Sequence, residues 1–145
     1  LTESGAILFY LAEGTAFLPD DAFERAQVLQ WIFFEQYSHE PAIAVARFWR
    51  HFLIDQVAAD EHMERALDEK MEKGYQALDV IERHLEGRAF LVAERYTIAD
   101  IALYAYTHVA DEGGFDLGPY PRIRAWLDRV ADQPHHVLIT QSDFG

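Results

Sequence analysis

Apolar side chains recur every three or four residues through most of the chain, and this spacing predicts helices. The clearest example is the segment 61–86, in which charged residues separate the members of one apolar stripe: Met63, Leu67, Met71, Gly74, Leu78, Ile81 and Leu85. Gly74 lies within this stripe, so we expect another helix to approach closely there. No segment sustains the alternation of apolar and polar residues that is typical of a half-buried strand. The sequence therefore predicts an all-α fold, a helical bundle.

The first predicted helix is short and covers residues 4–13. Thr2 or Ser4 is expected to cap its start, and Gly14 follows its end, where glycine commonly terminates a helix. A helix start presents unpaired backbone N–H groups and a partial positive charge, and a serine hydroxyl adds one more donor. Such a start favours a carboxylate or phosphate ligand, although a serine at this place can also serve only as a cap.

A long second helix is expected to begin at Asp20 or Asp21, either of which can cap it, and to run to about His39. Pro41 should then break or kink this helix before a further helix begins. The second helix is apolar on every side, through Val28, Leu29, Trp31, Ile32 and Phe34. Because such a helix must be covered on more than one face, we expect one face to meet the core and another to form a partner surface.

The segment 96–101, Tyr-Thr-Ile-Ala-Asp-Ile, predicts the start of a central helix. Thr97 is placed to cap the helix, and Asp100, three residues later, can reach back to the backbone N–H of Thr97. Tyr96 and Ile101 occupy the two positions of a hydrophobic staple. Asp100 is therefore interpreted as a structural residue and not as a general acid or base.

Composition and charge narrow the classes of function. The 145 residues make one domain, with a short N-terminal piece that we expect to belong to another domain. The net charge of −13 argues against nucleic acid and acidic lipid membranes as partners. The chain has no cysteine, so these residues contain no disulfide, thiolate metal site or cysteine nucleophile. No apolar run is long enough to span a membrane, and we expect a cytoplasmic protein.

Two further groups of polar residues are candidates for chemistry. Arg47, Arg50 and His51 form a second local set of donors that could hold a small anion. Glu35 and His39 lie four residues apart on one helix face, as metal ligands can, but nothing else in the sequence converges on them. We therefore expect solvated or core histidines and no metal. Neither a glycine-rich phosphate loop nor a nucleophile-bearing serine motif is present.

Several of these segments, in this order, resemble one known family, the soluble glutathione transferases. Residues 3–7 are similar to the Glu-Ser-x-Ala-Ile segment of that family, and residues 90–101 resemble its capping box and staple. The stretch 119–126 resembles the helix that follows, and residues 30–37 with Pro41 are similar to bacterial members. The resemblance implies that residues 1–14 are the last helix of a mostly absent thioredoxin-like domain. It implies that residues 15–145 are the all-helical C-terminal domain.

The resemblance also implies a ligand and a set of site residues. Ser4, with the backbone at Glu3, would bind the γ-glutamyl carboxylate of glutathione, which acts as a co-substrate, and a homodimer would form. The group that activates the thiol would lie upstream of Leu1, so no catalytic residue is expected in this chain. The wall of a pocket for a small hydrophobic electrophile is expected from five residues, Tyr37, Pro41, Ala44, Arg47 and Phe48.

Two functions of different class follow from the resemblance. The first is part of a glutathione transferase that conjugates or reduces small electrophiles in detoxification. The second is a non-catalytic helical module used for dimerisation or interaction. The pair Glu3 and Ser4 favours the first, because an interaction module does not need a helix start that anchors glutathione.

Overall fold

The structure, a computed structural model, describes residues 1–137 and Ile139. Over these residues it confirms the predicted all-α class, and the β pairing described there is one isolated bridge between Val92 and Arg95. The helices are α1 (Ser4–Ala12), α2 (Ala22–Phe34), α3 (Glu40–Phe52), α4 (Ile54–Ala59), α5 (Glu61–His84), α6 (Ile98–Thr107) and α7 (Pro121–Ala131), with a π-helical turn η1 (Glu35–His39) and a 3₁₀ turn η2 (Ala110–Gly113). None of the helices in the described residues is both long enough and apolar enough to cross a membrane.

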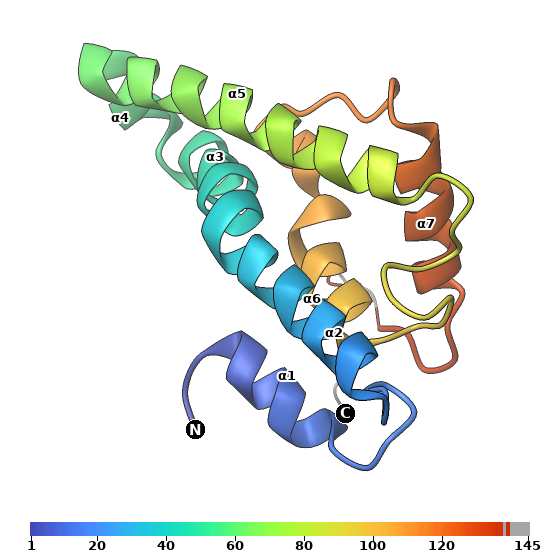
Figure 1. The fold of residues 1–145 in the computed structure, drawn as a ribbon. Helices are drawn as coiled ribbons and strands as arrows, with labels where there is room; N and C mark the ends of the chain where they lie inside the picture. Colours follow the sequence, from blue (N-terminus) through green and yellow to red (C-terminus); the bar gives the residue numbers. More distant parts are fainter. Residues whose placement is uncertain (138, 140–145) are drawn as a thin grey trace.

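The long rod formed by α2, η1 and α3 organises the bundle (Figure 1). α5 runs back beside α3, α6 lies behind the rod, and α7 covers the far side of α6. α1 lies across the lower end of the rod, where it contacts α6. The largest fully buried side chains come from most of these elements and include Val28, Ile43, Leu78, Ile98, Leu103, Phe115, Ile123 and Trp126.

Pro41 was expected to break or kink the helix, and it does not end the helical run, which continues from α2 through η1 into α3. It occupies the first turn of α3, directly after η1. In η1 the Glu40 N–H donates to the Glu35 carbonyl five residues earlier, so the helix widens at this point. The hydrogen bond that closes this wider turn does not use the missing N–H of Pro41, and the turn leaves room for the proline ring. Proline is therefore tolerated here as it is at the start of a helix.

The predicted capping box at α6 is confirmed, and Asp100 does more than close it. The fully buried Asp100 carboxylate accepts hydrogen bonds from the Thr97 N–H at 2.9 Å, the Leu91 N–H at 3.0 Å and the Trp126 Nε1–H at 2.9 Å. Burial raises the pKa of Asp100, while these hydrogen bonds oppose the rise. The carboxylate thus joins α6 to α7 and to the loop before α6.

Gly74 was expected to allow the close approach of another helix, but its nearest neighbour is the ring of Phe115, and α3 lies slightly farther away. A Cβ atom at this position would collide with the Phe115 ring, which comes from the segment after η2. It would also lie 3.3 Å from Cγ1 of Ile43 in α3. Gly74 therefore makes room for a buried aromatic side chain between α5 and α3.

The apolar second helix has one covered and one open face, as its pattern predicts. Val28, Trp31 and Ile32 are buried in the core, whereas Phe33 is 68% exposed and Tyr37 is 89% exposed. Large apolar side chains on a surface mark interaction sites when they lie together. The rod thus presents an uncovered apolar face in this chain.

We predict that Asp100→Asn lowers the free energy of unfolding by about 3 kcal/mol or more, because the amide turns an NH₂ group toward buried donors that need an acceptor. Urea denaturation followed by circular dichroism measures the change. The matched control is Asp68→Asn on the exposed side of α5, where a change within about 0.5 kcal/mol is expected. Equal effects of the two substitutions would contradict the role given to Asp100.

Candidate functional site

The start of α1 has an unusual backbone. Glu3 precedes the helix with φ 66° and ψ 119°, in a region that residues other than glycine rarely adopt. The first hydrogen bond of the helix runs from the Ile7 N–H to the Glu3 carbonyl at 3.0 Å. The N–H groups of Ser4, Gly5 and Ala6 therefore have no acceptor within the helix.

The sequence prediction that Thr2 or Ser4 caps this helix is wrong. Ser4 is already the first helical residue, and no side chain caps the start of α1 among the described residues. By contrast, Asp21 caps α2 as predicted, and Asp60 caps α5. The chain enters α1 through the positive φ of Glu3, and no side chain accepts hydrogen bonds from the first N–H groups. These N–H groups and the Ser4 hydroxyl therefore stay available to a ligand.

The geometry at Glu3 costs free energy that something must offset. A residue other than glycine in such a conformation costs about 1–3 kcal/mol, and conformations of this kind cluster at ligand-binding sites. A strained residue beside unpaired helix donors is the arrangement that holds a carboxylate or phosphate group. The first residues of α1 thus present a strained backbone beside N–H donors without acceptors in the helix.

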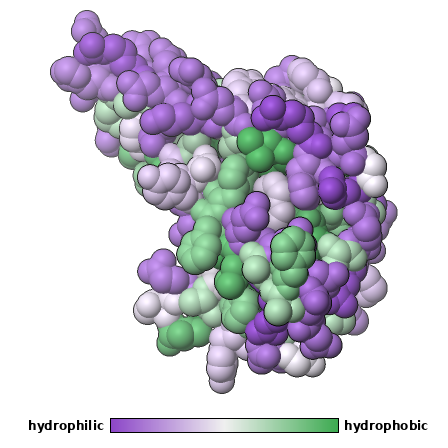
Figure 2. All heavy atoms as spheres, viewed as in Figure 1, coloured by the Kyte–Doolittle hydropathy of each residue, from purple (hydrophilic) through white to green (hydrophobic). Residues whose placement is uncertain are grey.

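An apolar groove of about 740 Å³ runs beside this helix start, between α1 and α2. Its lining includes Glu3, Gly5, Tyr10, Leu29, Phe33 and Gln36. Gly5 allows the two helices to approach, since a Cβ there would lie 2.6 Å from Cγ2 of Ile32. Figure 2 shows apolar side chains gathered across the middle of this face, whereas the projecting end of α4 and α5 is mostly hydrophilic. We call the hollow between α1 and α2 the α1–α2 groove.

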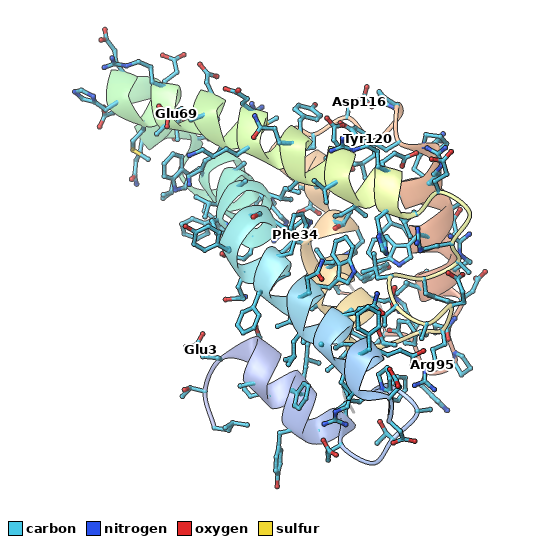
Figure 3. The ribbon with its side chains drawn as sticks, in the orientation of Figure 1. Glu3, Phe34, Glu69, Arg95, Asp116 and Tyr120 are labelled. Carbon is cyan, nitrogen blue, oxygen red and sulfur yellow. The ribbon has the colours of Figure 1, made fainter. Side chains whose placement is uncertain are left out.

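A second groove, of about 590 Å³, lies between the rod and α5. Its lining includes Phe34, Tyr37, Pro41, Lys70, Lys73 and Val80, and we call it the lysine groove. Phe34, labelled in Figure 3, lies on the part of the rod that faces α5. The lysines were not among the residues singled out from the sequence. Their spacing of three residues on one helix was the available signal.

The five residues expected to form the electrophile wall do not all meet in one hollow. Tyr37 and Pro41 line the lysine groove. Arg47 instead pairs with Glu112 of η2, with Nε 2.6 Å from the carboxylate oxygen. Ala44 is half-buried on α3 and Phe48 is exposed, in contact with the ring of Phe52. The donor set around Arg47 is thus partly neutralised by an acidic neighbour.

His39 is a core residue. It is fully buried, and its Nε2 lies 2.9 Å from Oγ1 of Thr107, whose hydroxyl donates to the Leu103 carbonyl at 2.6 Å. The imidazole must therefore donate through Nε2, which leaves Nδ1 unprotonated, and this buried atom has no hydrogen-bond partner among the described residues. Burial lowers the pKa of His39 to about 4.

Glu35, the other residue considered as a metal ligand, is also buried, and burial raises the pKa of its carboxyl group. Its Oε2 accepts a hydrogen bond from the Gln36 amide at 2.7 Å. Over the described part of the chain, no three His, Cys, Asp or Glu side chains lie together in a way that could hold a metal ion.

A family model described as the C-terminal domain of glutathione S-transferase matches residues 30–134. The chain belongs to the glutathione S-transferase family. Among solved structures, a glutathione S-transferase from Pseudomonas fluorescens Pf-5 is 55% identical, with a TM-score of 0.90 over 97% of this chain and 68% of that protein. The match extends through α1, which precedes the residues of the family model.

Two other relatives of this chain have a named ligand or activity. A glutathione transferase from Pseudomonas putida, with one glutathione disulfide bound per subunit, is 31% identical, with a TM-score of 0.78 over 92% of this chain and 59% of that protein. The disulfide-bond oxidoreductase YfcG of Escherichia coli K12 is 33% identical over 92% of this chain. This chain spans 60% of the length of YfcG.

We predict that His39 makes the protein less stable in acid. Between about pH 6.5 and 4 the unfolded chain binds a proton at His39 that the folded chain does not. The free energy of unfolding should therefore fall by about 1.4 kcal/mol for each pH unit of acidification in that window. Urea unfolding at several pH values should show a shallower slope for His39→Gln than for the wild type. His135→Gln, at an exposed histidine, is the control, and identical slopes for all three proteins would contradict the prediction.

Proposed function

We propose that this chain is the C-terminal part of a glutathione transferase that conjugates or reduces small electrophiles with glutathione. In this proposal residues 1–14 complete a thioredoxin-like domain, and residues 15–145 are the helical domain. The proposal is supported by family membership and by relatives that are longer than this chain. Such an enzyme would work in the cytoplasm.

The observation that carries the proposal is the start of α1. Glu3 is strained, the donors of Ser4 and of the next two N–H groups are free within the helix, and the sequence there is similar to the segment of the family that holds glutathione. A carboxylate placed at this point would receive several hydrogen bonds and the favourable end of the helix dipole. We assign that place to the γ-glutamyl carboxylate, with Ser4 and the backbone at Glu3 as its partners.

The chemistry needs a thiolate, because the thiolate and not the thiol is the nucleophile. We place the group that stabilises it upstream of Leu1. The role of this chain is then to anchor glutathione and to supply a wall of the electrophile pocket along the rod. Tyr37 and Pro41 contribute to it from the lysine groove, and Ala44, Arg47 and Phe48 contribute from positions outside that groove. Arg47 and its partner Glu112 would set the polarity at one side of that wall.

Reduction of disulfides is a second form of the same chemistry. The similarity to YfcG, a disulfide-bond oxidoreductase, favours it. In both reactions the thiolate of glutathione attacks, at a carbon of an electrophile in the first and at a sulfur of a disulfide in the second. The alternative of a different class, a non-catalytic module for dimerisation or interaction, would leave the strain at Glu3 without a purpose.

We also propose a homodimer in which α1 and α2 supply much of the interface. The α1–α2 groove and the exposed Phe33 give this face the apolar character of an interface core. Leaving the second apolar face of α2 in water costs free energy, because apolar surface is more stable when it is buried.

We expect Ser4→Ala, in the longer protein that contains this chain, to raise the KM for glutathione about 10- to 100-fold. The estimate is the loss of one hydrogen bond to a charged group. Steady-state assays with an aryl halide and with a glutathione mixed disulfide measure it, and the two substrates separate conjugation from reduction. Ser38→Ala is the matched control, and equal KM values for the two variants would refute the anchoring role.

Comparable turnover by the 145-residue chain alone would refute the placement of the activating group.

The substitution Glu3→Gly tests whether the strained backbone of Glu3 serves glutathione binding or only the stability of the fold. Glycine adopts a positive φ without cost, so this variant should keep or gain stability. Glycine also adopts many other conformations, so the N–H donors at the start of α1 are held less firmly and the affinity for glutathione should fall. Thermal unfolding and glutathione titration measure the two effects. A loss of stability with unchanged affinity would show that Glu3 has only a structural role.

Phe33→Glu should turn the dimer of the longer protein into a monomer at micromolar concentration, because it places a charge in an apolar interface. Sedimentation velocity measures the state. Phe23→Glu, on a residue that is equally exposed but outside the α1–α2 groove, is the control and should leave the dimer intact. A monomeric wild type would refute the proposed interface.

A further inference from the structure

Arg25 lies at a place where a cation does not suit its own helix. It belongs to the first turn of α2, and its backbone N–H donates to the Asp21 carbonyl at 2.9 Å. The start of a helix carries a partial positive charge, so a cation there weakens the helix. The side chain is nevertheless held close to the protein, with 28% of its surface exposed. Its partners in other elements explain this position.

The Arg25 guanidinium makes three contacts to residues outside α2. Nη2 donates to the Glu13 carboxylate at 2.9 Å, and the guanidinium carbon lies 5.2 Å from the centre of the Phe9 ring. Nη1 donates to the Pro19 carbonyl at 3.4 Å. Phe9 belongs to α1, Glu13 directly follows it, and Pro19 lies in the connector to α2. We call these three contacts the Arg25 clamp.

A different contact holds the first turn of α1 against α2. A Cβ atom at Gly5 would lie 2.6 Å from Cγ2 of Ile32, so the two helices approach closely there. Arg25 and Ile32 lie about 10 Å apart along the axis of α2, since each residue of a helix advances about 1.5 Å. The α1–α2 groove is lined by residues from both ends of α1, including Gly5 and Glu13. Because side chains do not fill this hollow, the position of α1 on α2 relies on both contacts.

The Arg25 clamp depends on the shape of an arginine. An ion pair alone would hold α1 weakly, because Glu13 is 61% exposed and water screens the pair. The contact with the Phe9 ring adds an attraction between the cation and the face of the ring. The guanidinium is planar, and its N–H donors point in fixed directions, so it can serve the carboxylate, the ring and the carbonyl together.

In the proposed function α1 and α2 belong to different domains, and Arg25 therefore spans the boundary between them. α1 carries Ser4, where glutathione would bind, and the rod supplies the wall for the electrophile. Reacting atoms must approach to about 3–3.5 Å, and a displacement of about 1 Å can lower a rate about 100-fold. A residue that fixes α1 against the rod would fix the distance between the two halves of the site.

We propose that Arg25 is a positioning residue that holds α1 on the helical domain and so sets the distance between bound glutathione and the electrophile. Its chemical consequence rests on the proposed function, whereas the clamp rests on the contacts of Arg25 alone. Glutathione would bind to α1 and to residues upstream of Leu1, so loss of the clamp should leave its affinity unchanged. The electrophile lies across the boundary, so its turnover should fall.

Hydrogen exchange of the 145-residue chain tests the clamp itself. Arg25→Gln removes the ion pair and the cation above the Phe9 ring, so the N–H groups of α1 should exchange about tenfold faster, whereas those of α5 should change by less than about twofold. Arg95→Gln is the matched control, because Arg95 also pairs with an acid of α2, Glu24 at 4.0 Å, in a contact that does not include α1. Equal exchange of α1 in the two variants would overturn the proposal.

Steady-state kinetics of the longer protein that contains this chain test the positioning role. At saturating glutathione, Arg25→Gln should lower kcat/KM for an aryl halide about tenfold or more, while the Kd for glutathione stays within about twofold. Ser4→Ala should act in the opposite way, on glutathione and not on the electrophile. Arg25→Lys, which keeps the charge, should recover part of the loss.

The kinetic results separate the positioning role from the proposed function. A higher Kd for glutathione with unchanged kcat/KM for the aryl halide, or an equal loss in Arg95→Gln, would overturn the positioning role. A wild-type longer protein that binds no glutathione would refute the proposed function, and with it the chemical consequence of the clamp. A failed exchange experiment would refute the clamp alone.

Discussion

The Asp100 carboxylate accepts hydrogen bonds from three separate parts of the chain: the loop at Leu91, the helix start at Thr97 and the Trp126 indole of α7. A buried carboxylate without donors would cost several kcal/mol, so these segments are held where they can supply them. Fixing the start of α6 also fixes the connector that follows α1. The Ile98 N–H donates to the Phe17 carbonyl at 3.0 Å, and Tyr96 packs edge-to-face on Phe17. The position of α1, and with it the proposed glutathione contact, therefore depends on the α6 capping box.

The π-helical turn has a comparable effect on the rod. One widened turn lets Pro41 continue the helix and directs neighbouring residues of η1 to different surroundings. Gln36 lines the α1–α2 groove, Tyr37 and Ser38 line the lysine groove, and His39 enters the core. The hydrogen bond from His39 to Thr107 ties this turn to α6. Turns of this kind are frequent at functional sites because they re-aim side chains without ending a helix.

Sequence patterns predicted the features that depend on near neighbours in the chain. The Thr97 capping box, the Asp21 cap and the left-handed Gly14 after α1 each follow from residues within one turn of each other. The contact of His39 with Thr107 and the pairing of Arg47 with Glu112 could not be predicted in this way, because the partners lie 65 or more residues apart. The strain at Glu3 was also hidden, since no glycine or asparagine marks the place where φ becomes positive. The role proposed for Ser4 was predicted from a capping geometry that the structure does not have.

Acidic composition gives this protein a particular way of attracting anions. Some of its 25 acidic residues pair with cations, as Glu112 does with Arg47 and Glu13 with Arg25. Backbone N–H groups at a helix start are satisfied by a neighbouring carboxylate only when that carboxylate caps them, and no side chain caps the start of α1 among the described residues. The α1 start keeps its donors for this reason. Lys70 is kept from acidic partners differently, by the Pro41 carbonyl, which holds its ammonium group while leaving the charge in place.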